Sequence, residues 1–346
     1  MLRKSYSGFK FVKMQVSAIV CSVLMIGLLT ACGDSENSTA ATNNVSPATV
    51  SSNSSTAVSA ESKEASQEEA SGERTVIDEL GHELVIPASP QNVYAPYLED
   101  SLLKLGVKPV AQWANGNQVH AYLQDQLKDI PLSDLSSGLP SPEVVMSYKP
   151  DLIILHTESF AKDYENYSKI APAYVFKNAS GNVEKSLSTL GDLLDKTAEA
   201  EKALQDYKEK VKISKEKLDQ AAAGKKVAII RFAGKGVSLM GKNYLCGYVV
   251  HQDLGVGNSK LVDTENSFNI SQEILPDLDA DYIFIINQYG QGTERLKEMT
   301  DSPIWQSIPA VKNGKVNEVD AGYWLGGGLI AYEKIIDDTV KFLTEE

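Results

Sequence analysis

Apolar residues in the last three quarters of the chain occur in short continuous runs separated by longer mixed segments. The clearest runs cover residues 151–155, 173–176, 226–232, 236–240 and 281–286. Runs of this length favour strands that are covered on both faces of a parallel sheet. The segments between them are long enough for helices, so the pattern predicts an α/β fold.

The first apolar runs indicate how the folded part begins. Residues 75–78 and 83–87 flank a turn at Gly81 and predict a short hairpin. Residues 92–95 and 107–113 then predict two strands, and residues 102–105 a helix that Gly106 ends.

A long helical region separates two such α/β halves. From Val183 to Ala222 the chain has no proline, and its single glycine is Gly191. Leu, Ala, Lys and Glu dominate this stretch, which favours helix. Forty residues would span about 60 Å if unbroken, which is longer than one lobe needs and leaves room for a kink or break. The sequence therefore predicts an N-terminal lobe at 74–182, a connecting helical region at 183–223 and a C-terminal lobe at 224–346.

The two halves share a short pattern. Ser141-Pro142-Glu143 lies eight residues before Asp151, and Ser271-Gln272-Glu273 lies eight residues before Asp281. Each copy predicts a serine N-cap, a glutamate in the first helical turn and a strand that begins at the aspartate. Capping chemistry recurs in many α/β proteins, but the matched positions predict two similar lobes, each with an exposed glutamate.

The N-terminal segment predicts export. Four basic residues precede an apolar run at about 16–29, and Leu29-Thr30-Ala31-Cys32 follows. This order is typical of a signal peptide, here residues 1–31, and the run is too short for a convincing membrane-spanning helix. The cysteine resembles the lipidated residue of a bacterial lipobox; an ordinary secretory signal with a chance cysteine is the alternative. Residues 32–73 are rich in Ser, Thr, Ala and Glu and predict a flexible tether.

Charge and cysteine content exclude several classes. The net charge is −13, and without the four basic residues of the first 31 it becomes −17. That argues against nucleic acid as a partner. Beyond Cys32 only Cys246 remains, so no disulfide framework is expected, and a lone cysteine is more often a buried apolar side chain than a reactive thiol.

Several features together resemble the substrate-binding lipoproteins of ABC importers. They are the lipobox, the tether, the long helical region and the segments VIDELGHELVIPASPQNV, EVVMSYKPDLIIL and VDAGYW. The resemblance is strongest to the iron–siderophore branch, and within it to Gram-positive iron–hydroxamate binders. It implies two Rossmann-like α/β lobes joined by one long helix, with the ligand cleft between lobes. It also implies a monomer, anchored through Cys32 on the extracytoplasmic face of the cell membrane. A permease with a cytoplasmic ATPase would receive the ligand, docking on Glu143 and Glu273.

The same resemblance indicates ligand residues. Tyr323 and Trp324 lie where hydroxamate binders have an aromatic wall, and Tyr244 replaces a tryptophan of the family pattern. Cys246 stands where those binders have an arginine that meets the chelate oxygens, so a standard hydroxamate site is in doubt. Arg231 and Lys242 are nearby candidates for the missing charge.

Histidines leave a second class of ligand open. His156 follows the strand at 151–155, at the end where α/β proteins bind ligands, while His120 and His251 lie elsewhere. Haem-binding relatives use such side chains as iron ligands, so haem, and then a corrinoid such as cobalamin, are the alternatives to a ferric siderophore. The protein itself is expected to hold no permanent cofactor and to ligate no metal directly. A surface hydrolase or adhesin is the alternative from another class, but no nucleophile motif, metal motif or repeat supports it.

Overall fold

The computed structural model describes residues 72–262 and 267–345. The predicted signal peptide, the lipidation site Cys32 and nearly all of the predicted tether lie outside the described residues. The first strand starts at Glu73, so the folded part begins at the last residue of the predicted tether. In the described part of the chain, no helix is both long and apolar enough to cross a bilayer.

The N-terminal lobe is built on short parallel strands. The predicted hairpin is present as β1 (Glu73–Ile77) and β2 (Glu83–Pro87). β6 (Leu152–Leu155) lies between β3 (Val93–Tyr94) and β7 (Ala173–Val175), all parallel. β4 (Gln112–Ala114) pairs in parallel with β5 (Leu132–Asp134). Leu152 to Leu155 are all buried, as the apolar run predicted.

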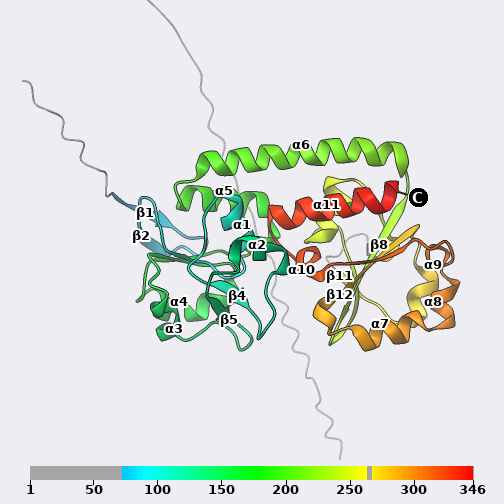
Figure 1. Cartoon of the computed structure of the whole chain (residues 1–346), viewed down its shortest axis with the longest axis horizontal. Coiled ribbons are helices and arrows are strands. Elements are labelled where there is room, and N and C mark those ends of the chain that lie inside the picture. Colours follow the sequence, from blue (N-terminus) through cyan, green and yellow to red (C-terminus); the bar gives the residue numbers. More distant parts are fainter. Residues whose placement is uncertain (1–71, 263–266, 346) are drawn as a thin grey trace, which may run out of the picture. The chain divides into compact units, whose positions relative to one another are not determined.

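Short helices cover these strands (Figure 1). They are α1 (Glu99–Lys104), η1 (Ala121–Leu123), α2 (Gln124–Leu127), α3 (Pro142–Ser147), η2 (Glu158–Asp163), α4 (Tyr164–Tyr167) and η3 (Ala179–Gly181).

The connecting region consists of two helices rather than one. α5 (Val183–Leu193) and α6 (Thr197–Ala221) are separated by a tight turn in which Asp195 has φ of 55°. Gly191 permits this turn, because a Cβ there would lie 2.6 Å from the Cβ of Ala200. α5 therefore folds back against α6, and α6 alone continues into the C-terminal lobe (Figure 1).

The C-terminal lobe contains a 6-stranded mixed sheet, with β11-β9-β8-β12-β13 in order and β10 paired to β8. Its strands are β8 (Lys226–Ala233), β9 (Gly236–Met240), β10 (Gly257–Asn258), β11 (Ser267–Asn269), β12 (Tyr282–Asn287) and β13 (Val316–Val319). The expectation of parallel strands throughout is wrong for β9, which is antiparallel to β8. Only Gly234 and Lys235 separate the two strands, and a connection that short permits only a hairpin.

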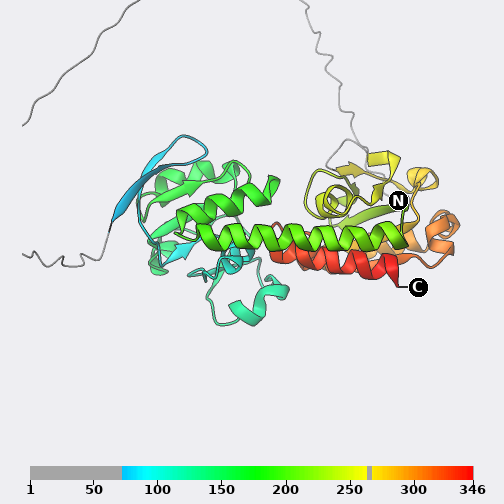
Figure 2. The same ribbon diagram turned by 90° about the horizontal axis from the view of Figure 1, so that it is seen from above.

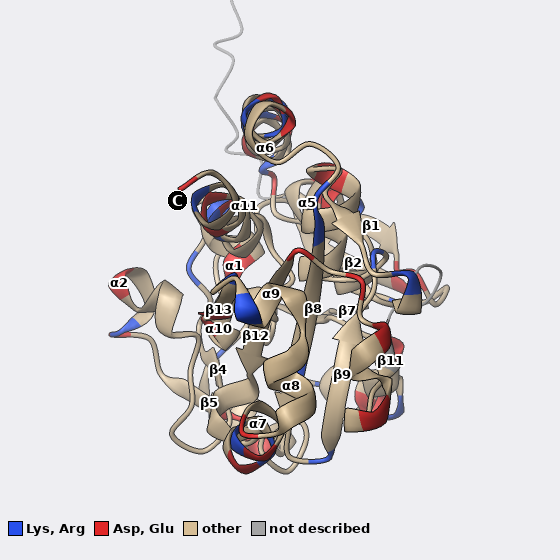
Figure 3. Ribbon diagram, turned by 90° about the vertical axis from the view of Figure 1, so that its right-hand side faces the viewer, with Lys and Arg blue, Asp and Glu red and all other residues tan. Residues whose placement is uncertain are grey.

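The helices of this lobe are η4 (Tyr248–Asp253, π-helical), η5 (Lys260–Val262), η6 (Gln272–Asp277), η7 (Gln288–Gly290), α7 (Thr293–Thr300), α8 (Pro303–Ser307), α9 (Pro309–Lys312), α10 (Ala321–Trp324) and α11 (Leu329–Thr344). α11 runs beside α6 (Figure 2). Lysine, arginine and acidic residues are interspersed around the outer turns of α6 and α7 (Figure 3).

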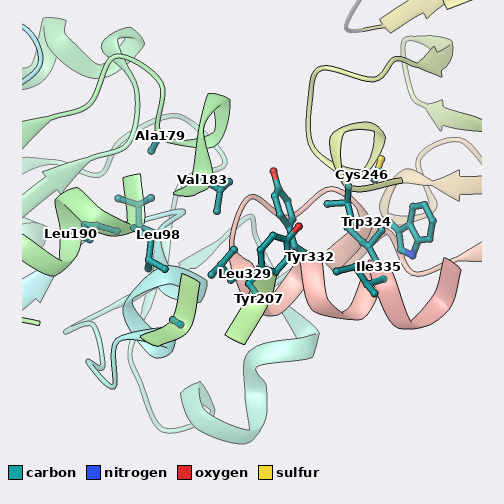
Figure 4. Packing of buried hydrophobic residues seen from close by; sticks show 14 of the residues in the cluster. Leu98, Ala179, Val183, Leu190, Tyr207, Cys246, Trp324, Leu329, Tyr332 and Ile335 are labelled. Atoms are coloured by element: carbon teal, nitrogen blue, oxygen red, sulfur yellow. The ribbon is translucent and has the colours of Figure 1, made fainter. Parts of the chain in front are cut away.

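One buried apolar cluster extends through both lobes. It includes Leu98 of the N-terminal lobe, Tyr207 of α6, and Trp324 and Tyr332 of the C-terminal lobe (Figure 4). Two further clusters each belong to a single lobe. The lobes thus have separate sheets but share part of their core, in keeping with the predicted fold class. The ligand cleft between them stays a prediction.

Candidate ligand-binding site

Aromatic side chains from separate segments gather where the N-terminal lobe meets the C-terminal lobe. This aromatic cluster consists of Tyr97, Trp113, His120, His156, Phe160 and Tyr289. Tyr97 is central, with its ring centroid 4.5 Å from that of His156 and 5.6 Å from that of Trp113. His120 stacks on Trp113 at 4.6 Å. Faces of this kind bind large planar or apolar ligand surfaces.

The cluster bridges the two lobes. Tyr289 is its member from the C-terminal lobe, and its ring lies 6.4 Å from that of Trp113. Gln118 Nε2 also approaches the Tyr289 carbonyl oxygen, at 3.5 Å. A ligand bound here would contact both lobes at once.

The backbone at two of these rings is in the left-handed region. Tyr97 has φ of 70° and Tyr289 has φ of 48°, and neither is glycine. Side chains rarely adopt this conformation because of contacts with their own backbone. Such positions persist where surrounding structure holds them, and they concentrate at binding sites. Here the Tyr97 ring contacts Trp113 and His156 of its own lobe, and the Tyr289 ring contacts Trp113 of the opposite lobe.

Several buried polar atoms beside the cluster have no hydrogen-bond partner. They are Glu99 Oε2, His120 Nδ1 and His156 Nδ1, whereas Trp113 Nε1 faces the Tyr97 hydroxyl. Glu99 is fully buried, and its other oxygen accepts a hydrogen bond from the Trp113 backbone N–H at 2.6 Å. Buried polar atoms normally have partners, so these three atoms are available for contacts with a bound molecule.

Burial sets the protonation of these groups. It raises the pKa of Glu99 to about 7 and lowers the pKa values of His120 and His156 to about 4. At neutral pH both imidazoles are therefore uncharged, while Glu99 is partly ionised. Neutral imidazoles can each donate and accept one hydrogen bond.

The C-terminal side supplies one guanidinium. Arg231 of β8 donates from Nε and Nη2 to Gln288 Oε1, at 2.8 and 2.5 Å. Its charge counteracts the effect of burial on the pKa values of Tyr244 and Tyr289, which places both phenols near it. Arg231 and Tyr244, both predicted as ligand residues, are thus neighbours beside the cluster.

The prediction that Trp324 forms an aromatic wall is wrong. Its side chain has no exposed surface, packs edge-on against Phe284 and donates from Nε1 to Asp338 at 2.9 Å. Tyr323 is half-buried and donates to the same carboxylate at 2.7 Å. Its ring reaches the edge of Tyr122, 6.1 Å away, rather than any member of the cluster recorded above. Asp338 holds both rings to α11.

Cys246 and His251 belong to the interior of the C-terminal lobe. Cys246 is fully buried, and burial raises the pKa of its thiol to about 12, in accord with a buried apolar role. His251 Nδ1 lies 3.0 Å from the Val256 carbonyl oxygen. No group of three or more possible metal ligands occurs among residues 72–262 and 267–345.

Sequence reasoning missed Tyr97, Glu99, Phe160 and Tyr289 as site residues. All four lie just beyond the carboxyl ends of parallel strands, namely β3, β6 and β12. Ligands in α/β folds bind at this edge. The rule that selected His156, applied to every predicted parallel strand, would have found them.

Glu143 and Glu273 occupy matched and exposed positions. Glu143 lies in the first turn of α3, and Glu273 in the first turn of η6. Ser141 and Ser271 occupy the predicted N-cap positions with extended backbone, although neither side chain makes a capping hydrogen bond. A hydrogen bond from Ser141 instead lowers the pKa of Glu143.

The aspartates of the repeated pattern confirm that these positions are equivalent. Asp151 accepts hydrogen bonds from the backbone N–H groups of Gln91 and Asn92, just before β3. Asp281 likewise accepts from the N–H of Lys226 at the start of β8. Each aspartate joins its strand to the parallel neighbour, so the two glutamates have the same place in their lobes.

Comparison with known proteins agrees with this architecture. The family model described as "Periplasmic binding protein" matches residues 95–323. The probable siderophore-binding lipoprotein YfiY of Bacillus subtilis is 28% identical over 298 residues, covering 81% of this chain and 90% of that protein. The iron(3+)-hydroxamate-binding protein YxeB of the same organism is 28% identical over 258 residues, covering 69% and 76%.

A solved structure extends the comparison to three dimensions. The chain is similar to Staphylococcus aureus SirA, crystallised as a complex with staphyloferrin B. The TM-score is 0.68 and the identity 26%, and the match covers 78% of this chain and 98% of SirA. The similarity therefore includes both lobes and α6.

Proposed function

Since the chain belongs to the periplasmic binding protein family and its relatives are siderophore-binding proteins of ABC importers, we propose that it captures a ferric hydroxamate at the aromatic cluster. The observation that carries this proposal is the set of unpartnered buried polar atoms among the rings that join the lobes. Aromatic faces would cover the organic surface of the chelate, and polar atoms would meet its amide and hydroxamate groups.

Arg231 is the residue that would face the iron-bound oxygens. Its guanidinium has fixed donors, and Gln288 Oε1 accepts from only two of its nitrogens. Tyr244 and Tyr289 lie near the same charge and would complete this side. His156 would contribute from the N-terminal lobe. We retain Arg231, Tyr244 and His156 from the sequence prediction, add Tyr289, and replace Trp324 with Trp113 as the aromatic wall.

Titration of residues 72–346 with a ferric trihydroxamate tests the ligand assignment. We expect saturable quenching of tryptophan fluorescence, and weaker binding when Arg231 is replaced by Gln. Ferric citrate, haem and cobalamin are the comparison ligands. Saturable binding of one of these, with none of the hydroxamate, would replace the hydroxamate assignment.

Haem is the second candidate, because the buried Nδ1 atoms of His120 and His156 have no partner and could ligate iron. Direct ligation would change the visible absorption spectrum of haem. Replacement of the responsible histidine by Ala would abolish that change.

Delivery would depend on the paired glutamates. Glu143 and Glu273 are exposed at matched positions, so each can pair with an arginine of a permease in a bidentate geometry. Two such contacts would sense the spacing of the lobes. A separate cytoplasmic ATPase would power transport, and the binding protein would act as a monomer without catalysis.

Uptake measurements separate docking from ligand binding. Glu143→Ala combined with Glu273→Ala should abolish uptake of the iron-55 chelate while leaving its Kd unchanged. Glu165→Ala with Glu298→Ala, which removes an exposed glutamate from each lobe elsewhere, is the matched control. Unimpaired uptake by the first pair would refute the docking role.

The lipid at Cys32 would keep the protein on the extracytoplasmic face of the membrane. Cys32→Ala should release the protein into the medium without affecting ligand binding by its folded part. Retention of that variant in the membrane fraction would contradict anchoring through Cys32.

A further inference from the structure

The polar side of the aromatic cluster is poor in positive charge. Burial raises the pKa of Tyr289, the Asp320 carboxylate raises it further, and the Arg231 guanidinium counteracts the increase. The charged group that acts on the Tyr97 hydroxyl is the carboxyl group of Glu99. The charges that surround these two phenols are thus two carboxyl groups and one guanidinium, and the guanidinium already contacts Gln288. A chelate with a high negative charge would be repelled here.

Glu99 is placed to act on this site through His120. Its Oε2 atom lies 3.8 Å from His120 Nε2, too far for a hydrogen bond but close enough for one to form after a small movement. His120 in turn stacks on Trp113. Both Glu99 Oε2 and His120 Nδ1 are without partners, at opposite sides of the same imidazole.

One arrangement satisfies both atoms. Where Glu99 is ionised, above its pKa of about 7, His120 carries its proton on Nε2 and donates to Glu99 Oε2, so that Nδ1 becomes an acceptor. An N–H group of the ligand can donate to that nitrogen, and the negative charge of Glu99 strengthens the contact. A carboxylate, catecholate or other anionic oxygen cannot, because it would meet a second acceptor.

We propose, on the basis of the function proposed above, that Glu99 and His120 select a ferric chelate that carries a protonated amine and no net negative charge. The ammonium group donates to His120 Nδ1, while Arg231 of the opposite lobe faces the iron-bound oxygens. Glu99 acts as a positioning residue for His120, and His120 as the residue that contacts the ligand.

The segment that carries His120 allows this contact to form. It lies between β4 and η1, and it meets the C-terminal lobe through Gln118 Nε2 and the Tyr289 carbonyl oxygen at the long distance of 3.5 Å. A ligand that enters between Trp113 and Tyr289 breaks this weak contact. His120 then turns toward Glu99 and the ligand.

A pair of chelates that differ only in the amine tests the inference. Ferrioxamine B is a ferric trihydroxamate with a pendant ammonium group, and its N-acetylated form is neutral and otherwise the same. We expect the protein to bind ferrioxamine B about tenfold more tightly at pH 7.5, the order expected of a charge-assisted hydrogen bond. Glu99→Gln keeps the shape and an acceptor for the Trp113 N–H, and it should bring the ratio of the two Kd values to about 1.

His120→Phe and Glu165→Gln complete the design. His120→Phe retains the stacking on Trp113 but has no ring nitrogen, so it should also abolish the preference. Glu165→Gln removes an exposed carboxylate from the same lobe and should leave the ratio unchanged. Circular dichroism establishes that each variant is folded.

The possible outcomes distinguish failure of the Glu99 and His120 inference from failure of the hydroxamate assignment. Equal binding of both chelates by the unsubstituted protein, or a preference that survives in Glu99→Gln, overturns the role of Glu99 and His120 and leaves the hydroxamate assignment intact. Binding of neither chelate overturns the hydroxamate assignment itself. The comparison within the unsubstituted protein does not depend on the folding of any variant.

Discussion

The Glu99 carboxyl is buried without exposed surface, and this makes folding stability depend on pH. Its pKa is about 7 in the folded protein, above the ordinary value of 4.5, because burial disfavours the charged form. Between these two values the folded state binds more protons than the unfolded state. The contribution of Glu99 to stability is therefore complete below about pH 4.5 and is lost as the pH rises to about 7.

Comparison with Glu99→Gln isolates this effect. The free energy of unfolding of the unsubstituted protein, relative to that of Glu99→Gln, should decrease as the pH rises from about 4.5 to 7. Urea denaturation at several pH values measures it. The titratable groups that face Glu99 are Asp100, His120, Tyr94, Tyr97 and Tyr122.

The titration of His120 changes the stability in the opposite direction. The difference in the free energy of unfolding between the two proteins is therefore the informative quantity. Burial lowers its pKa to about 4, so its contribution to stability rises with pH up to its ordinary value of 6.5. Both proteins contain His120, and its effect largely cancels. A difference that does not change with pH would show that Glu99 titrates normally in the folded protein.

Trp113 should be the main fluorescent reporter of ligand binding. All three tryptophans are buried, but Trp113 packs in the aromatic cluster, whereas Trp305 and Trp324 pack in cores of the C-terminal lobe. Trp113→Phe should lose most of the quenching by a ferric hydroxamate, because contact quenching requires proximity. Trp324→Phe is the control and should keep it. If quenching depended on Trp324 instead, the aromatic cluster would not be the site.

At the level of elements, a side chain of the N-terminal lobe caps the last helix of the chain. Asp100 of α1 accepts hydrogen bonds from the backbone N–H groups of Ile330 and Ala331, at 3.0 and 2.9 Å, in the first turn of α11. Gly328 makes room for it, since a Cβ there would lie 2.1 Å from Asp100 Oδ1. Lys104 and Glu333 add an ion pair of 2.5 Å between the same helices. α1 and α11 are thus joined across the lobes.

Loss of this cap should destabilise the whole protein. Asp100→Ala leaves two helix N–H groups and the Tyr122 hydroxyl without their acceptor, and we expect it to cost about 2 kcal/mol or more in the free energy of unfolding. Denaturant titration measures this. Asp337→Ala, which removes an exposed ion pair of α11 with Lys210, should cost less than about 1 kcal/mol. Equal losses in the free energy of unfolding would mean that the cap contributes no more to stability than an exposed ion pair.

Elements could be predicted where a local pattern decides them. The apolar runs at β6, β8 and β12 predicted these strands correctly, because a strand that is buried on both faces has a continuous apolar sequence. The strand expected at 107–113 is only Gln112–Ala114. Pro109 has no N–H for a sheet ladder, and residues on either side of it make isolated contacts instead.

The site residues could not all be predicted, because their positions depend on contacts between distant segments, which no local sequence pattern contains. Trp324 is in the core because Phe284 and Asp338 lie beside it after folding. Tyr97 belongs to the site because its left-handed backbone directs the ring to Trp113 and His156. Glu99 looked like an ordinary acidic residue at a helix start, and only its burial distinguishes it.

At the scale of the whole molecule, the shared core restricts how far the lobes can move. Side chains of the N-terminal lobe, α6 and α11 pack in one buried cluster (Figure 4), and Asp100 joins α1 to α11. A large hinge motion would open this cluster and expose apolar surface, which is unfavourable. Ligand binding should therefore change contacts at the aromatic cluster while α6 and α11 stay as they are.

Amide hydrogen exchange with and without a ferric hydroxamate distinguishes these regions. Protection should increase in residues 113–122 and 287–292, which carry Trp113, His120 and Tyr289, because the ligand holds these segments together. Exchange in the middle of α6 and α11 should be the same in both states. Faster exchange at the centre of α6 on binding would mean that the helix bends as the lobes close. In that case the spacing between Glu143 and Glu273 would change greatly on loading, and a permease could recognise the loaded protein by that spacing alone.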